Sequence, residues 1–161
     1  MGKLPRKFWL FCIVDAFGYS SVHAFYPNMS KFFQEKFDFN NTQAGVISSI
    51  PYGIAAFSVP IVGSLLRGRS DKVYEDSMLT ALLLVFGTHA FYLMIIEHLS
   101  HSWISILPVF AFGLGHAIFT TLIAATVPKV IDNQDQLSIS FSILKVSEGF
   151  ENQHWKNCTQ I

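Results

Sequence analysis

Residues 42–66 contain no charged side chain, and this stretch limits what the chain can fold into more than any other. At a rise of about 1.5 Å per residue, a helix of this length crosses a hydrocarbon core of roughly 30 Å. Small residues recur at Gly45, Ser49 and Gly53, along one edge of such a helix. Because small ridges let membrane helices approach closely, we expect this edge to pack against another helix. The alternative is that glycine is simply common in membrane spans.

Composition indicates that lipid is the main solvent of the chain. The sequence is 51% hydrophobic and 14% charged, whereas about 25% of the residues in an ordinary soluble domain are charged. Further apolar stretches at 8–30, 78–96 and 104–130 are long enough to span, and a fifth helix begins at Leu137. We therefore expect an all-α membrane helix bundle with four spans and a partial fifth.

The fifth helix ends near Phe150, too early to cross a membrane. We interpret it as a span that is cut off partway, and the alternative is an interfacial helix. Residues 1–150 would then form one membrane domain, and residues 151–161 a polar tail.

The basic residues predict the orientation of the bundle. Lys and Arg are retained on the cytoplasmic side of membrane proteins. Nine Lys and Arg residues lie before, between or just after the four spans, and seven of these fall on the side of the N-terminus, whereas two, Lys31 and Lys36, fall on the other side. We therefore expect a cytoplasmic N-terminus. The opposite side carries Asn40 in an Asn-Asn-Thr triplet, which makes this residue a glycosylation candidate.

Nothing in the sequence indicates an enzyme, a cofactor or a metal site. Cys12 lies in an apolar run and Cys158 in the polar tail, without the Cys/His spacing of metal ligands. Neither a Ser/His/Asp order nor a phosphate-binding loop is present. Because basic and acidic residues are equal in number, at 11 each, nothing argues for nucleic acid.

Asp15, Tyr19 and His23 follow at intervals of four in the first apolar stretch, so they lie on one side of a helix. A carboxylate at membrane depth costs about 2.5 to 3.5 kcal/mol on insertion scales, which makes it a functional candidate. Asp15 could carry a coupling proton or hold a substrate amine, while His23 titrates near neutral pH. The alternative is a structural aspartate that is paired in the bundle or hydrated at the cytoplasmic end.

His116 and Thr120 lie on one face of the 104–130 stretch, and Gly113 and Gly115 beside them would let another backbone come close. This pair could meet a substrate carboxylate or amide. The competing interpretation is a structural histidine held by a hydrogen bond.

The basic entry into the first stretch, the small-residue span and the short charged loop after it resemble one half of a major facilitator superfamily transporter. The family's loop follows the pattern Gly-x-x-x-Asp-Arg/Lys-x-Gly-Arg/Lys, and the loop here begins at Gly63. Arg67 stands where the family has aspartate, and Asp71 comes later. The loop therefore departs from the family's charge pattern.

More specifically, KLPRKFWLFCIV and FFQEKFDFNNTQAGVISSIPYGIAAFSVPIVGSLL resemble the start of the second half of the lysosomal dipeptide transporter group. The resemblance implies helices seven to ten of twelve and the start of helix eleven, about two-thirds of one half, with the first half missing. It implies a fragment of a proton-coupled secondary transporter of small solutes such as dipeptides, in the lysosomal membrane. The first and fourth spans would line the cavity, whereas the 78–96 span would lie outside and carry no site.

The partners implied are membrane lipid, the missing half or other membrane subunits, and small peptides. A second hypothesis is a degenerate half-transporter that does not transport and serves as a structural subunit or scaffold in a membrane assembly. Arg67 in place of aspartate and the missing half favour this alternative, whereas ancestry favours the transporter.

Overall fold

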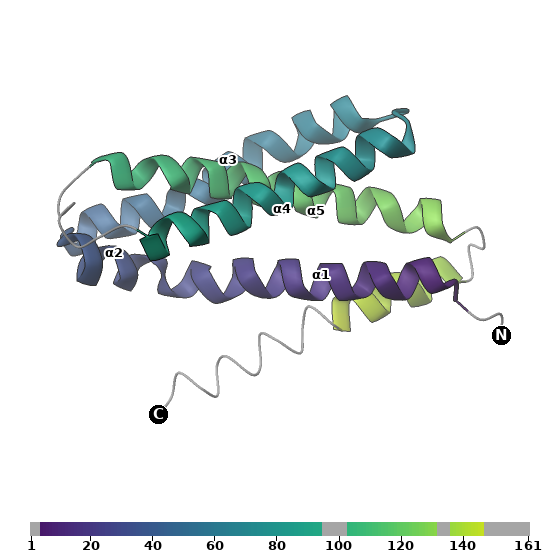
Figure 1. The fold of residues 1–161 in the computed structure, drawn as a ribbon, viewed down its shortest axis with the longest axis horizontal. Coiled ribbons are helices and arrows are strands. Elements are labelled where there is room, and N and C mark those ends of the chain that lie inside the picture. Colours follow the sequence, from purple (N-terminus) through teal and green to yellow (C-terminus); the bar gives the residue numbers. More distant parts are fainter. Residues whose placement is uncertain (1–3, 95–102, 132–135, 147–161) are drawn as a thin grey trace. The chain divides into compact units, whose positions relative to one another are not determined.

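The computed structural model describes residues 4–94, 103–131 and 136–146, and its elements in these ranges are all helices. The elements, in chain order (Figure 1), are α1 Arg6–Phe25, the 3-10 helix η1 Tyr26–Asn28, α2 Met29–Phe37, α3 Asn41–Leu66, α4 Asp71–Met94, the 3-10 helix η3 Trp103–Ile106 and α5 Leu107–Val130. A shorter apolar helix follows over Gln136–Val146.

Four segments are long and apolar enough to cross a membrane: Arg6–Phe37, Asn41–Leu66, Asp71–Met94 and Ile104–Val130. The prediction of an all-α bundle with four spans and a shorter fifth helix is therefore confirmed for the described part of the chain. The third span begins at Asp71 and not near residue 78. The predicted polar tail over 151–161 and the last residues of the fifth helix, 147–150, lie outside the described residues.

The first span is longer than its predicted end at residue 30. A single 3-10 turn, Tyr26–Asn28, follows α1, and α2 then continues the span. Pro27 has no amide hydrogen to donate, which suits the start of a helix, where amides have no partner within the helix. The turn therefore joins two helices within one span.

The sequence between the predicted spans 8–30 and 42–66, FFQEKFDFNNTQ from Phe32, predicts a short polar connector, and this prediction is wrong as far as Phe37 because α2 continues to that residue. Within α2, every fourth residue from Met29 to Phe37 is buried, which gives the helix one apolar face. The helix ends at Asp38, whose left-handed φ of 55° turns the chain toward α3. Lys31 and Glu35 are exposed, so part of the predicted connector belongs to a helix that packs by its apolar face.

Residue Asn40 starts α3 through a capping box. Its side-chain oxygen accepts a hydrogen bond from the Gln43 amide at 2.8 Å, and its own amide donates to Oε1 of Gln43 at 3.1 Å. The helix runs unbroken through Pro51 and Pro60. Of the four spans it has the smallest buried share, 11% of its most apolar stretch.

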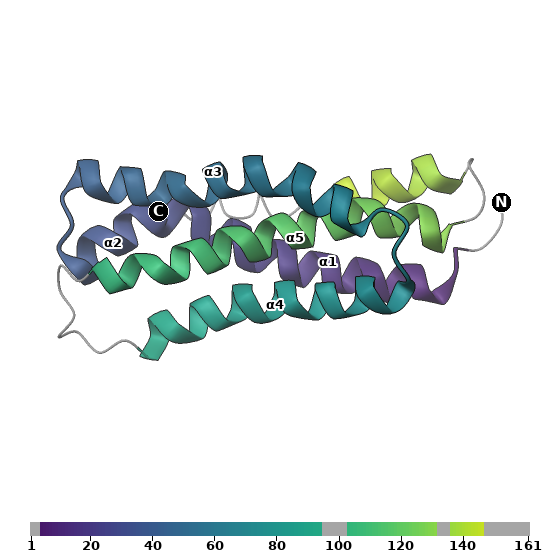
Figure 2. The same ribbon diagram turned by 90° about the horizontal axis from the view of Figure 1, so that it is seen from above.

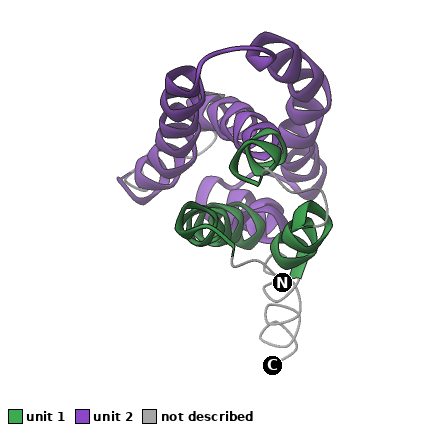
Figure 3. Cartoon of the chain, turned by 90° about the vertical axis from the view of Figure 1, so that its right-hand side faces the viewer, with its two compact units in different colours: residues 1–24, 123–161 green, residues 25–122 purple. Residues whose placement is uncertain are grey.

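The chain forms two compact units (Figure 3), one of residues 1–24 and 123–161 and the other of residues 25–122. The core of the first unit consists of Phe8, Cys12, Val127, Ile131 and Leu144, contributed by α1, by α5 with the residue that follows it, and by the helix Gln136–Val146. In the second unit α5 lies between α3 and α4 (Figure 2).

Candidate functional site

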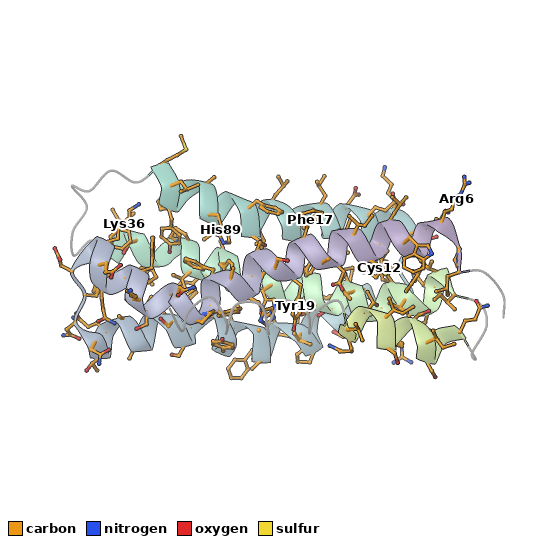
Figure 4. The ribbon with its side chains drawn as sticks, turned by 90° about the horizontal axis from the view of Figure 1, so that it is seen from below. Arg6, Cys12, Phe17, Tyr19, Lys36 and His89 are labelled. Carbon is orange, nitrogen blue, oxygen red and sulfur yellow. The ribbon has the colours of Figure 1, made fainter. Side chains whose placement is uncertain are left out.

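The three candidate residues of the first span lie on α1 in the first unit, and Figure 4 labels Tyr19 among them. Asp15 is fully buried, with 0% of its surface exposed. The rings of Tyr19 and His23 stack, with centroids 3.9 Å apart and planes at 26°. A buried carboxyl group, a phenol and an imidazole on one helix are groups that can hold and pass a proton.

His116 on α5 is hydrogen-bonded to a residue that sequence reasoning missed. Its Nδ1 lies 2.9 Å from the hydroxyl oxygen of Tyr26 in η1. The phenol donates if Nδ1 is unprotonated and accepts if Nδ1 carries the proton. The bond joins the first and fourth spans within the second unit.

Aromatic rings surround this hydrogen bond. The ring of Tyr26 lies 4.3 Å from that of Tyr52 on α3, at an interplanar angle of 30°. Phe112, one turn before His116 on α5, contacts the Tyr26 ring edge to face at 5.4 Å. Tyr26 is 6% exposed, whereas Tyr52 is 57% exposed. The stack thus runs from the interior of the second unit to its surface.

Two glycines fix α5 between its neighbours. A Cβ on Gly113 would lie 2.9 Å from the Cα of Pro51 on α3, closer than real Cβ atoms approach. A Cβ on Gly115 would lie 2.9 Å from the Cβ of Leu84 and 3.0 Å from the carbonyl oxygen of Ala81, both on α4. Backbones can meet this closely only where no side chain intervenes. Both contacts lie within one turn before His116, so they fix the position of this part of α5 relative to α3 and α4.

Thr120 lies one turn beyond His116 on the same helix. Its hydroxyl donates to the carbonyl oxygens of His116 at 3.0 Å and of Ala117 at 3.2 Å. The hydroxyl proton is therefore shared between carbonyls of α5, and the lone pairs of Thr120 remain as acceptors. His116 and Thr120 thus lie on one helix, as predicted. The hydrogen bonds of the Thr120 hydroxyl stay within this helix, whereas His116 is hydrogen-bonded to another span.

A second polar chain joins α2, α4 and η3 and was not expected. The ammonium group of Lys36 donates to the carbonyl oxygen of Tyr92 at 2.6 Å and lies 5.7 Å from the centre of the Phe32 ring. The hydroxyl of Tyr92 donates to the Ser105 carbonyl at 2.8 Å. Because Tyr92 is near the C-terminal end of α4, where carbonyls have no partner in the helix, Lys36 caps that helix from outside.

His89, also on α4, contacts Phe25 and Phe112 edge to face at 5.2 and 5.7 Å. Its Nδ1 donates to the Val85 carbonyl oxygen of the same helix at 2.8 Å, which is a structural role. Figure 4 labels both Lys36 and His89. The sequence predicts a hydrated end of the 78–96 span at Glu97, His98 and His101, and these residues lie outside the described residues.

The small-residue edge of α3 meets no other described helix. Gly45, Ser49 and Gly53 are all exposed, and nothing lies within 4 Å of a Cβ placed on either glycine. The hydroxyl of Ser49 donates to the Val46 carbonyl at 2.7 Å. The close approaches of the second unit occur at Gly113 and Gly115 instead, and packing against the α3 edge stays a prediction.

The loop between α3 and α4 places its charges at helix ends. Gly68 has a φ of 73°, and the carbonyl of Leu66 accepts from the Arg69 amide and from the hydroxyl of Tyr74, each at 3.1 Å. Arg67 follows the end of α3, and Asp71 is the first residue of α4. A cation at a helix C-terminus and an anion at an N-terminus both complement the helix dipole.

This arrangement gives a physical account of the departure from the family's charge pattern. Arg67 is compatible with its position because it lies beside the C-terminal carbonyls of α3, and Asp71 supplies the acidic group at the start of the next helix. Gly63, the first residue of the motif, passes α5 in ordinary contact, since a Cβ there would lie 3.7 Å from Cγ2 of Thr121.

The described residues contain no group of three or more His, Cys, Asp or Glu side chains that could hold a metal ion.

Comparison with family models then decides the class of protein. The model of the Major Facilitator Superfamily matches residues 3–145. The chain belongs to this superfamily. Neither the curated proteins nor the solved structures gave a match.

Membership in the major facilitator superfamily agrees with the four apolar helices, and the protein is an integral, multi-pass membrane protein of the transporter type. The match covers α1 to α5 and most of the helix Gln136–Val146, so both candidate sites fall within it. In secondary transporters of this kind, solute binds near the middle of the bilayer between two helix bundles that rock against each other.

Proposed function

We propose that this chain forms one wall of a proton-coupled secondary transporter of small solutes such as dipeptides. The observation that carries the proposal is the burial of Asp15, which is 0% exposed within an apolar helix of the superfamily. Because a buried carboxylate is costly in a span, an aspartate at this position is best explained by a cycle of protonation and deprotonation.

The Tyr19 and His23 stack supports a role of α1 in proton movement. Their rings are 3.9 Å apart on the helix that carries Asp15, and His23 lies two turns beyond it. Phenol and imidazole groups can each accept and donate a proton. A proton that enters α1 therefore has more than one group on which to reside.

The pair Tyr26 and His116 supports a solute-facing role of the second unit. Their hydrogen bond of 2.9 Å brings two polar side chains together in the middle of two apolar spans. Polar groups at that depth are expensive in lipid and usually face a cavity or a partner. A solute carboxylate or amide could hydrogen-bond to this pair.

The opposite wall of the cavity comes, in this proposal, from a second helix bundle that packs on the exposed edge of α3 at Gly45, Ser49 and Gly53. The resemblance to lysosomal dipeptide transporters further supports a lysosomal membrane location and small peptides as solutes, and the distribution of basic residues supports a cytoplasmic N-terminus. Because one wall alone leaves the cavity open, the chain purified and reconstituted by itself should give no saturable dipeptide uptake.

The experiment that tests the proposal compares Asp15→Asn with wild type in the native assembly, purified through a tag on this chain and reconstituted in liposomes. Asp15→Asn keeps the size of the side chain and removes its charge, so we expect normal expression and loss of uptake driven by a pH gradient. Asp76→Asn, an exposed acid near the start of α4 and outside the loop motif, is the matched control and should transport normally.

Two results would contradict the proposal. If Asp15→Asn transports like wild type with an unchanged pH profile, Asp15 is structural. If wild type itself takes up no solute while Asp15→Asn assembles as well as wild type or better, the scaffold alternative is the better account, since the buried charge then serves no transport and its removal leaves assembly unharmed or improves it.

A further inference from the structure

The side chain of Tyr52 carries a polar hydroxyl group within a membrane-spanning helix, where lipid solvates such a group poorly. It lies near the middle of α3 (Asn41–Leu66) and is 57% exposed. Within the part of the chain that the structure describes, no hydrogen bond reaches its hydroxyl. Tyrosine is otherwise favoured at the edges of a membrane, where its hydroxyl meets water. The hydroxyl of Tyr52 would therefore be better solvated by a polar cavity than by lipid.

The position of Tyr52 is well fixed. Pro51, the preceding residue, is in backbone contact with Gly113 of α5, and the inner side of the Tyr52 ring packs on Tyr26 at 4.3 Å. Tyr26 is in turn held by its hydrogen bond to His116. The exposed face of the Tyr52 ring is thus a rigid aromatic platform, prepared before a ligand binds.

The chemistry of this platform favours a ring over a cation. No Asp or Glu lies on the spanning parts of α3 or α5, so the described residues beside Tyr52 supply no countercharge for an ammonium group. An aromatic ring would instead continue the stack of Tyr26 and Tyr52 and cover apolar surface that is now exposed.

We propose that Tyr52 is a specificity-determining residue that binds the aromatic side chain of a solute, so that the transporter prefers dipeptides with an aromatic residue. The proposal rests on the proposed function for its solute class. Tyr26, which is held by His116, packs on the inner face of the Tyr52 ring. The aromatic ring of the solute packs on the outer face and becomes the third member of the stack.

The test compares two dipeptides of nearly equal size and apolar area, Ala-Phe and Ala-cyclohexylalanine, of which only the first can stack. Dissociation constants are measured by titration calorimetry on the native assembly in lipid nanodiscs. A stacked aromatic pair contributes binding free energy beyond that of its buried area. Ala-Phe should therefore bind about 2- to 13-fold more tightly than Ala-cyclohexylalanine. Uptake of Ala-Ala is measured in parallel as the readout of transport.

Three variants assign the preference to Tyr52. Tyr52→Leu should remove the preference for Ala-Phe, whereas Tyr52→Phe keeps the ring and should retain it. Phe57→Leu is the matched control, because Phe57 is an exposed ring on the same helix, 77% exposed, and has no ring partner among the described residues. It should bind both dipeptides as wild type does.

Equal affinities for the two dipeptides in wild type, or a preference that survives in Tyr52→Leu, would overturn the inference even if Ala-Ala is taken up and the proposed function stands. Failure of Ala-Phe to bind at all would overturn it as well. Selective binding of Ala-Phe that depends on Tyr52, in a protein that takes up no dipeptide, would support the platform and contradict the proposed transport function.

Discussion

The hydroxyl oxygen of Tyr26 lies 2.9 Å from Nδ1 of His116, a residue 90 positions further along the chain. This contact ties the 3-10 turn of the first span to the middle of the fourth. It also supports the stack of Tyr26 on Tyr52, so one hydrogen bond organises a polar and aromatic cluster from three spans.

The strength of this bond can be measured with a double-mutant cycle. Tyr26→Phe and His116→Phe each remove one partner while keeping a ring. Hydrogen bonds between membrane helices are worth about 0.6 kcal/mol on average and up to about 1.7 kcal/mol. We expect a coupling energy in that range from the unfolding free energies of the wild type, the single variants and the double variant. Additive effects would mean that the bond adds no stability.

The glycine that brings α3 and α5 together should tolerate no larger residue. In Gly113→Ala the new methyl group would lie 2.9 Å from the Cα of Pro51, and backbone atoms cannot move aside cheaply. We expect a loss of about 1 to 3 kcal/mol in the free energy of unfolding.

Gly53→Ala is the control for this prediction, since a Cβ there meets nothing within 4 Å. In the chain alone it should be neutral or gain up to about 1 kcal/mol from helix propensity. Thermal unfolding in detergent compares the two variants. Equal melting temperatures would show that α3 and α5 are further apart than described.

Two lysines of α2 should differ in their effect on stability. Lys36→Met removes a hydrogen bond of 2.6 Å from an ammonium group to the Tyr92 carbonyl, and such bonds contribute about 1.5 to 3 kcal/mol. Lys31→Met removes only a surface pair with Glu35, 3.7 Å apart with side chains 76% and 68% exposed, worth at most about 1 kcal/mol. A larger loss of unfolding free energy for Lys31→Met than for Lys36→Met would contradict this account.

The orientation of the bundle is predicted from the distribution of basic residues and can be tested by labelling. Single cysteines at Asp71 and at Asn40, in a chain with Cys12 and Cys158 replaced by serine, should react with a membrane-impermeant maleimide from opposite sides. Asp71 should be cytoplasmic. Reaction of both cysteines from the same side would exclude an odd number of membrane crossings between them and with it the four-span arrangement.

The spans could be predicted from sequence because a long uncharged, apolar stretch has few possible structures other than a membrane-spanning helix. The uncharged stretch 42–66 corresponds to α3, Asn41–Leu66, almost residue for residue. The helix α2 was missed because its polar residues suggested a loop, although Met29, Phe33 and Phe37 have the spacing of a helix face. That periodicity was the available signal.

The candidate site was only partly predictable. His116 was found because a histidine is conspicuous in an apolar stretch, whereas Tyr26 was missed because tyrosine is common at membrane edges and its partner is distant in sequence. The sequence also could not show which small residues pack closely against a neighbouring helix. Gly53 and Gly113 lie in similar apolar surroundings, yet only Gly113 contacts another backbone, since that depends on how α3 and α5 pack.

The central claim is that solute and protons move together through an assembly built on this chain, with Asp15 as the proton carrier. The most direct measurement follows the internal pH of liposomes that contain the native assembly and a pH-sensitive dye, with no pH gradient imposed at the start. Addition of Ala-Phe outside should acidify the interior in wild type and leave it unchanged in Asp15→Asn. Uptake of labelled Ala-Phe without any acidification, or equal acidification in Asp15→Asn, would contradict the claim.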